Sequence, residues 1–329
     1  MRVLVVKLSS LGDVVHTMPA VQDIRGALPD ARIDWVVERG FAPLVARCEG
    51  VDRVIASDLR RWRNEPFAAQ TRSEWRAFRA RLRGECYDAV VDLQGLTKSA
   101  LVSRMVRLAS GGKRYALANQ TEGAGYEAPT RWLADVAIRV EPHIHAVQRS
   151  RELCARAFGY KVPVSLEYGL QASAGWTFHA IKTVANGEIA LVHGSSRDDK
   201  CWPEPYWIEL GRRLIAQGHI LGLPHGSDDE RERSERLARA LGVQASVWPR
   251  LDLDVLTDRL AACAGVIGVD SGLSHVAVAL GLPHVQIYNF DTAWRTGPPD
   301  CARQQSVFAH PAPSIDLVWN AWQQVRAVV

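Results

Sequence analysis

Apolar and polar positions along this chain form two kinds of block: short β-branched runs and longer stretches with helical periodicity. In the first half, four apolar runs predict strands that are buried on both faces, at Val3–Leu8, Ile33–Val37, Arg53–Ala56 and Tyr87–Asp92. The segments between them are long enough for crossover helices, which indicates a βαβ series. A helix is also expected over His145–Phe158, because Gly159 can end it.

The second half repeats this rhythm. Its predicted strands are Ile189–His193, Ile220–Leu223, Val266–Val269 and His284–Tyr288. Its predicted helices are Tyr206–Gln217, Asp228–Leu241, Asp254–Cys263 and Ser274–Leu280. Residues 160–187 hold no strong core strand, so we place the linker there and expect domains at 1–165 and 166–329. In open parallel sheets, ligands bind beyond the carboxyl ends of the strands, which makes the loops after strands the places to search.

Length and composition agree with two soluble α/β domains. The chain has 329 residues, enough for about two domains, and its 47% hydrophobic and 23% charged residues exclude disordered and fibrous classes. Its 6 cysteines form no C-x-x-C pair, which favours a reducing compartment. We see no signal peptide or membrane-spanning stretch, and therefore expect a cytoplasmic protein.

Charge is divided unevenly between the halves. Residues 1–165 carry 26 Lys and Arg against 18 Asp and Glu, whereas 166–329 carry 14 against 18. Eight arginines and only two acidic residues fall within 60–83. Such a segment attracts phosphate on a nucleic acid, a lipid headgroup or a substrate.

The loop after the first strand is rich in small residues and ends at Asp13. Ser10 and Gly12 allow a substrate to approach the backbone, and Asp13 is placed to take a proton from a hydroxyl nucleophile. The alternative is that Asp13 caps the following helix.

The loop after Ile189–His193 combines hydroxyls with a cation. Ser195, Ser196 and Lys200 resemble a cradle for a diphosphate, although the Walker spacing is absent. Asp198 and Asp199 could hold a metal, but the flanking cations favour solvated turn carboxylates. A purely structural polar loop before Pro203 is the alternative.

Two further strand-end loops carry candidate donor-site residues. Ser227 and Glu230 have the spacing of a capping box, yet an acidic residue in such a loop also binds ribose. Asp270, Ser271, Gly272 and His275 lead into a helix whose N-terminal N–H groups suit a pyrophosphate. A capping role for Asp270 and a buried structural role for His275 stay open.

Trp75, Phe78 and Leu82 give the arginine-rich segment one apolar face. This pattern suits either an anionic membrane surface or packing against the protein's own core, and we favour packing for Trp75 and Phe78. Arg60, Arg61 and Arg63 repel one another unless an anion lies near them.

Several of these blocks together resemble glycosyltransferase family 9, the heptosyltransferases of lipopolysaccharide. They are Ser9–Ala20, Asp34–Glu38, Arg60–Arg63, Tyr87–Leu96, Arg197–Glu204 and Asp270–His275. The first four blocks are most similar to the members that add the first heptose. The resemblance extends from residue 1 to about residue 290, but not over Asn119–Gly125 or the loop after Tyr288.

The resemblance implies the GT-B architecture, an α/β fold with two Rossmann-like parallel-sheet domains facing a central cleft. The first domain would bind the acceptor and the second the nucleotide sugar, and the C-terminal helix could pack back on the first. The implied reaction moves L-glycero-D-manno-heptose from ADP-heptose to the Kdo sugar of Kdo₂-lipid A with inversion.

The resemblance also assigns roles to residues of this chain. Asp13 would be the catalytic base, and Lys200 would stabilise the leaving group. The implied donor-binding residues are Ser195, Ser196, Lys200, Glu230, Asp270, Ser271, Gly272 and His275. The implied acceptor-binding residues are Ser10, Gly12, Arg60, Arg61, Arg63, Gln94 and Lys98.

No metal or other cofactor is expected to be obligatory, because Lys200 and the helix N-terminus can stabilise the leaving anion. We expect a monomer that binds peripherally to the cytoplasmic face of the inner membrane and binds no nucleic acid. The alternatives are a family 9 transferase with a different core acceptor, a nucleotide-sugar epimerase of GT-B fold and a bilobal solute receptor.

Overall fold

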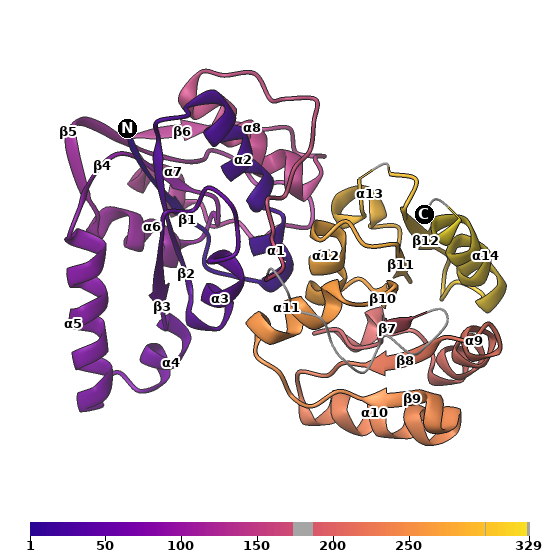
Figure 1. The fold of residues 1–329 in the computed structure, drawn as a ribbon. Coiled ribbons are helices and arrows are strands. Elements are labelled where there is room, and N and C mark those ends of the chain that lie inside the picture. The colour runs from indigo at the N-terminus through magenta and orange to yellow at the C-terminus, as the bar shows by residue number, and fades with distance from the viewer. Residues whose placement is uncertain (174–186, 300, 328–329) are drawn as a thin grey trace. The chain divides into compact units, whose positions relative to one another are not determined.

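The apolar runs of the sequence form the centres of two six-stranded parallel sheets, one in each half of the chain (Figure 1). The structure is a computed structural model that describes residues 1–173, 187–299 and 301–327. The chain divides after Gln171 into a first unit, Met1–Gln171, and a second unit, Ala172–Val329. This division lies shortly after the boundary at residue 165 expected from sequence. Most of the expected linker, 174–186, lies outside the described residues.

The first unit has the strand order β3-β2-β1-β4-β5-β6. Its strands are β1 Arg2–Val6, β2 Arg32–Glu38, β3 Arg53–Ser57, β4 Cys86–Asp92, β5 Arg107–Leu117 and β6 Val136–Ile138. Its α-helices are α1 Leu11–Val15, α2 Met18–Ala27, α3 Ala42–Val45, α4 Leu59–Asn64, α5 Ala69–Arg83, α6 Thr97–Met105, α7 Pro129–Leu133 and α8 Ala146–Phe158, and a 3₁₀ turn covers Arg39–Phe41. The four predicted strands are confirmed, and α8 ends where predicted, because Gly159 adopts φ 75°.

Helices cover both faces of the first sheet. Leu4, Val6 and Val90 point toward α4, α5 and α6, where they join a core with Phe78 and Leu82. The helices α2 and α8 pack against each other, with α8 against β5 and β6. The apolar face of α5 is therefore used inside the first unit, as we favoured for Phe78.

The second unit has the strand order β12-β11-β10-β7-β8-β9. Its strands are β7 Glu188–Val192, β8 Ile220–Leu223, β9 Ala245–Val247, β10 Gly265–Val269, β11 His284–Tyr288 and β12 Gln304–Phe308. Its α-helices are α9 Glu204–Ala216, α10 Asp228–Leu241, α11 Leu253–Ala261, α12 Gly272–Ala279, α13 Ala293–Thr296 and α14 Ile315–Arg326, and 3₁₀ turns cover Asp198–Lys200 and Gly242–Gln244. All four predicted strands and all four predicted helices of this half are present.

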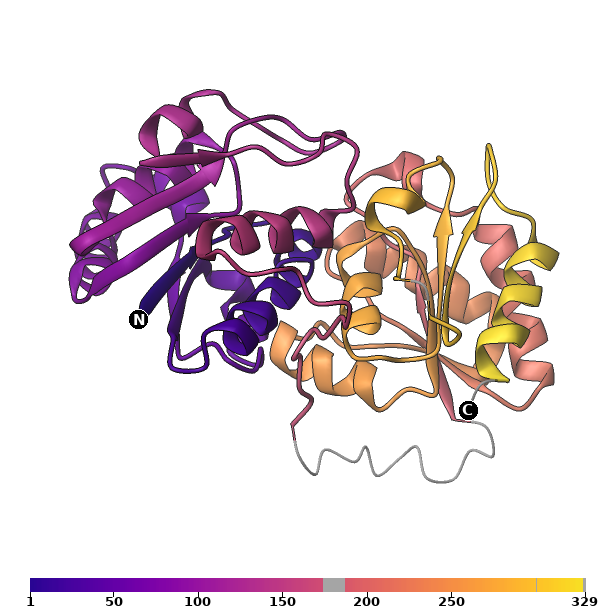
Figure 2. The same cartoon turned by 90° about the horizontal axis from the view of Figure 1, so that it is seen from above.

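One face of the second sheet packs against α9, α10 and α14, while α11 and α12 lie together on the other side (Figures 1 and 2). The helix α14 contributes Val318, Trp322 and Val325 to this core. Its apolar face is therefore buried within the second unit.

In each sheet the strand order reverses beside the first strand of the unit, and this reversal is the topological switch point. It locates the candidate sites. In the first sheet, β1 pairs with β2 on one side and with β4 on the other. In the second, β7 pairs with β8 and β10 in the same way. Ligands of open α/β sheets bind beyond the strand ends at such a switch point. The loops after β1, β4, β7 and β10 are therefore the expected sites.

Among the helices that the structure describes, none combines the length and hydrophobicity needed to cross a bilayer.

Candidate active site

Asp13 lies in α1, directly beyond the switch point of the first sheet. One carboxylate oxygen, Oδ1, accepts hydrogen bonds from Lys7 Nζ at 3.3 Å and from Arg149 at 3.4 Å. The other, Oδ2, accepts from the Ser10 hydroxyl at 3.0 Å and the Ser10 backbone N–H at 3.3 Å. Ser10, not Asp13, is therefore the N-cap of α1, and Asp13 Oδ2 completes the capping box from the third helical position. Oδ1 has a different environment, between two cations.

The cations determine the charge of Asp13. Burial alone would raise the pKa of this carboxyl, but Lys7, Arg149 and His16 together outweigh burial and hold the pKa well below its ordinary value. Asp13 is therefore ionised at neutral pH. Its side chain is still 36% exposed, so a substrate hydroxyl can reach it.

Lys7 and Arg149 are the functional residues that sequence reasoning missed in this unit. Lys7 directly follows β1 and is 1% exposed, and its ammonium also donates to the Leu93 carbonyl oxygen at 3.1 Å. Arg149 comes from α8, 136 positions away in the sequence, and also donates to the Thr121 hydroxyl. Nothing in the periodicity of α8 distinguishes this arginine from one on a solvated face.

The loop after β4 is hydrogen-bonded to the loop after β1 and holds it in place. The side-chain oxygen of Gln94 accepts from the backbone N–H groups of Leu8 and Ser9, at 3.0 and 3.1 Å. Asp92 accepts from the Gln94 and Gly95 N–H groups, and burial raises the pKa of Asp92 to about 6. This contact gives Gln94 a positioning role beside the acceptor-binding role that was expected.

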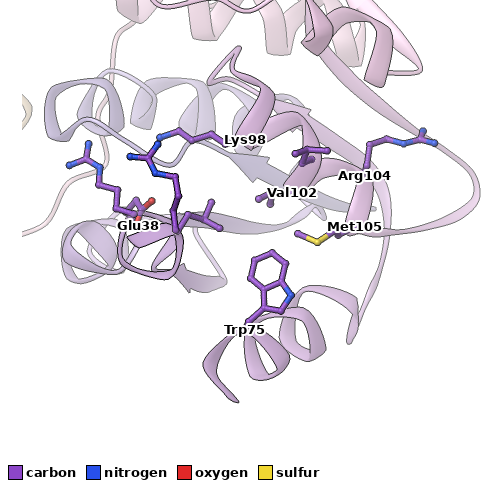
Figure 3. Close-up of a pocket in the computed structure, with 10 residues that line it drawn as sticks. Glu38, Trp75, Lys98, Val102, Arg104 and Met105 are labelled. Atoms are coloured by element: carbon purple, nitrogen blue, oxygen red, sulfur yellow. The ribbon is translucent and has the colours of Figure 1, made fainter. Parts of the chain in front are cut away.

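The three clustered arginines do not share one role. Arg61 pairs with Asp58 at 2.9 Å and with Glu74, whose carboxylate also accepts from the Trp62 indole N–H. Its charge is balanced inside the unit, so an acidic acceptor would compete with Asp58 and Glu74 for it, and its acceptor role stays a prediction. Arg60 and Arg63 are exposed. Both line a pocket of about 510 Å³ together with Lys98 (Figure 3).

The second candidate site centres on Asp270, which follows β10. Lys200 Nζ donates to Asp270 Oδ2 at 2.6 Å, and the His275 ring nitrogen Nε2 lies 3.3 Å from Oδ1. The N-cap of α12 is Ser271, so Asp270 is not the cap that sequence left as an alternative. The structure brings together Lys200, Asp270 and His275, as expected.

Asp270 is a buried anion held by its neighbours. Burial alone would raise the pKa of Asp270, but the hydrogen bond and charge of His275, together with Lys200, outweigh it and lower the pKa. Thr296 and Gln286 also approach Oδ1, at 3.4 and 3.5 Å. Sequence reasoning missed both, because Gln286 lies inside the buried strand β11 and Thr296 ends α13, in the segment after β11 that it could not interpret.

Hydroxyl and N–H groups surround this cluster. Ser195 donates to the Asp270 backbone oxygen at 3.2 Å, whereas Ser196 is exposed. The Ser271 hydroxyl oxygen is buried and has no hydrogen-bond partner among the described residues. With Gly272 at the first position of α12, it can contribute to an anion site.

Glu230 forms the capping box, one of the two roles that the sequence left open. Its Oε2 accepts from the Gly226 and Ser227 N–H groups, and the Ser227 hydroxyl accepts from the Glu230 N–H, which completes the capping box. The other oxygen, Oε1, lies over Gly194, where an added Cβ would stand only 2.3 Å from it. Glycine at 194 therefore leaves room for the carboxylate beside the loop after β7.

Asp199 pairs with Arg197, as expected for a solvated turn. Within the described ranges, no group of three or more His, Cys, Asp or Glu side chains has the arrangement of a metal site. The turn is fixed instead by Asn289, whose amide donates to the Asp199 and Cys201 carbonyl oxygens at 3.0 Å each.

The comparison with known families identifies the chain. The model of glycosyltransferase family 9 (heptosyltransferase) matches residues 75–317. The chain belongs to glycosyltransferase family 9. The predicted fold class and the predicted enzyme class, a glycosyltransferase, are confirmed. The epimerase and solute-receptor alternatives are excluded.

Comparison with individual members of family 9 shows which heptosyltransferases the chain is similar to. The chain is 40% identical to lipopolysaccharide heptosyltransferase 1 of Escherichia coli K12 over 292 residues, 88% of each chain. It is 27% identical to lipopolysaccharide heptosyltransferase 2 of the same strain, over 88% of this chain and 82% of the relative. Among solved structures, E. coli heptosyltransferase WaaC with ADP matches with a TM-score of 0.86 and 32% identity, over 99% of this chain and 100% of the other.

Proposed function

We propose that this enzyme transfers L-glycero-D-manno-heptose from ADP-heptose to a Kdo residue of Kdo₂-lipid A, with inversion, in lipopolysaccharide inner-core biosynthesis. The observation that carries the proposal is the ionised Asp13 held by Lys7 and Arg149 beyond β1, in a chain 40% identical to a heptosyltransferase 1. The higher identity to heptosyltransferase 1 than to heptosyltransferase 2 favours the first acceptor of the series. A solved relative that contains ADP supports the nucleotide part of the donor.

On the acceptor side, Asp13 acts as the general base. The Kdo hydroxyl attacks the anomeric carbon, a new C–O bond forms, and the hydroxyl proton passes to a carboxylate oxygen of Asp13. A carboxylate with a depressed pKa is a weak base, so it takes the proton late, when the C–O bond is largely made and the hydroxyl has become acidic. Lys7 and Arg149 keep Asp13 ionised and fixed for this step.

On the donor side, the bond between the anomeric carbon and the diphosphate oxygen breaks, and ADP takes the electron pair. Lys200 and the N–H groups at the start of α12 stabilise the developing charge. Glu230 binds the ribose, with Gly194 giving its carboxylate room. The same groups let us propose that catalysis needs no metal, and full activity in excess EDTA is the expected result.

We further propose that the enzyme works on the cytoplasmic face of the inner membrane. The excess of basic residues in 1–165 and the exposed arginines of α5 support attraction to an anionic surface. Cosedimentation with anionic vesicles that weakens as salt rises is expected.

The experiment that tests the function is heptose transfer by Asp13→Ala. Turnover with Kdo₂-lipid A should fall about 10²–10⁴-fold, the usual contribution of a general base, while the Kd for ADP-heptose stays unchanged. Asp30→Ala, which removes an exposed carboxylate of the same unit, is the matched control. Wild-type kcat in Asp13→Ala, or no transfer to Kdo₂-lipid A by the wild-type enzyme, would refute the proposal.

A further inference from the structure

The pocket beside Arg60 and Arg63 has two chemically different sides. Glu38 and Lys98 lie on one side, and the apolar side chains of Trp75, Val102 and Met105 gather on the other (Figure 3). Its volume of about 510 Å³ falls within the roughly 300–1,000 Å³ that is typical of small-molecule sites. Four cationic side chains and a single carboxylate line it, so its charge favours an anionic ligand.

Glu38 provides an independent sign of a ligand. It is 7% exposed, and its Oε1 has no hydrogen-bond partner among the described residues. Burial raises the pKa of Glu38, although Lys98 and Arg60 oppose the rise. A buried carboxylate oxygen without a donor is costly. A hydroxyl or amide N–H of a bound molecule would supply the missing donor.

One lining residue of the pocket is hydrogen-bonded to the loop that carries Asp13. The backbone N–H of Glu38, at the end of β2, donates to the carbonyl oxygen of Leu8 at 3.0 Å. Leu8 lies in the loop that leads to Asp13, so Glu38 ties one wall of the pocket to that loop.

We propose that this pocket binds an acyl chain of the acceptor glycolipid. The hydrocarbon packs on Trp75, Val102 and Met105, and an amide N–H or hydroxyl of the chain donates to Glu38 Oε1. Arg60 and Arg63 then meet the phosphate of the same molecule. The inference rests on the proposed function, and it adds that the lipid part of the acceptor contributes to recognition.

The test compares two acceptors, Kdo₂-lipid A and its fully deacylated saccharide, and uses Leu101→Asp. Leu101 lines the pocket on α6 and is 54% exposed, so the substitution leaves the core intact while placing a charge against the hydrocarbon. The matched control is Leu317→Asp on α14, where the leucine is 43% exposed.

The wild-type enzyme should show a KM for the acylated acceptor at least about tenfold below that for the saccharide, as expected for burial of a few methylene groups. Leu101→Asp should remove this difference by raising only the acylated KM. It should leave kcat and the ADP-heptose KM unchanged. Leu317→Asp should behave as wild type.

Other results overturn the inference. Equal KM values for both acceptors in the wild type, or an equal shift of both in Leu101→Asp, would remove the acyl chain from the pocket. No transfer to either acceptor would instead refute the proposed function, and the inference with it. If Leu101→Asp loses binding to phosphatidylglycerol vesicles while keeping the wild-type KM for detergent-dispersed Kdo₂-lipid A, the pocket holds a bulk membrane lipid and the inference is wrong.

Discussion

Lys200 Nζ and Asp270 Oδ2 lie 2.6 Å apart and join the loops that follow β7 and β10. The lysine side chain is 22% exposed and the aspartate 5%, so the pair stands at the edge of the buried site. The cation proposed to stabilise the leaving group is thus already balanced by a carboxylate. A diphosphate that arrives there competes with Asp270 for the ammonium group.

This competition predicts opposite effects of two substitutions on ADP binding. Asp270→Asn removes a negative charge from the anion site, so the Kd for ADP should fall severalfold, while transfer slows because the cluster that holds Lys200 and His275 is lost. Lys200→Ala should weaken ADP binding and cost about 2.7–4 kcal/mol of transition-state stabilisation, by analogy with an oxyanion donor. Calorimetric titration of ADP and steady-state kinetics check both. Weaker ADP binding by Asp270→Asn would contradict the competition.

Gly194→Ala should weaken donor binding without slowing the transfer step. The added Cβ would stand 2.3 Å from Glu230 Oε1, so the carboxylate must move away. We expect the ADP-heptose KM to rise about tenfold, as for one lost hydrogen bond to a charged group, with kcat nearly unchanged. Gly226→Ala is the matched control, because its Cβ would lie 3.4 Å from Glu230 Oε2. A KM for Gly194→Ala equal to that of Gly226→Ala would show that Glu230 does not contact the donor.

The arginine cluster should separate into structural and binding residues. Arg61→Ala leaves Asp58 and Glu74 with the more exposed Arg39 as their cation, so it should lower the Tm and leave the acceptor KM near the wild-type value. Arg60→Ala and Arg63→Ala should raise the acceptor KM and reduce its salt dependence, with an unchanged Tm. Thermal melting and kinetics at two ionic strengths check this division. A raised acceptor KM with an unchanged Tm in Arg61→Ala would show that Arg61 binds the acceptor.

Asp92 should give the stability of the protein a recognisable pH dependence. Its pKa is about 6 in the folded state against an ordinary 3.8, so the folded state binds the proton more tightly than the unfolded state. The stabilisation from this proton is complete below about pH 4 and is lost as the pH rises through 6, with a total of up to about 3 kcal/mol.

Asp92→Asn should remove this component, because the amide keeps an acceptor for the Gln94 and Gly95 N–H groups but does not titrate. Denaturant unfolding of both proteins between pH 4 and 7 measures it. Parallel stability profiles would show that Asp92 titrates normally.

The sequence predicts the central strands of each sheet well and the outer strands poorly, and the reason is burial. Central strands such as β1 and β7 are buried on both faces and read as continuous apolar runs. The strand β5 contains Ser110, Gly111, Gly112 and Lys113, and the edge strand β12 begins with two glutamines, so neither resembles a core strand. Partly exposed strands lose the hydrophobic signal on which the prediction depends.

The sequence predicts which loops carry the site residues, but it does not predict which side chains pair with one another. Asp13, Lys200 and Asp270 follow predicted strands, and topology alone places them at the switch points. Arg149 reaches Asp13 only because α8 folds against the first sheet. The pairing of Arg61 with Glu74 likewise depends on how α4 meets α5. Such contacts decide which charges are available to a ligand.

The pairing of β1 also bears on how the protein emerges from the ribosome. Val3 lies opposite Ile33 in β2 but opposite Ala89 in β4. One edge of this apolar strand therefore gains its neighbour early in synthesis, while the other stays open until β4 has been made. An open apolar edge invites pairing with another chain. The nascent first unit is thus most vulnerable to aggregation during that interval, when a chaperone would have the most to shield.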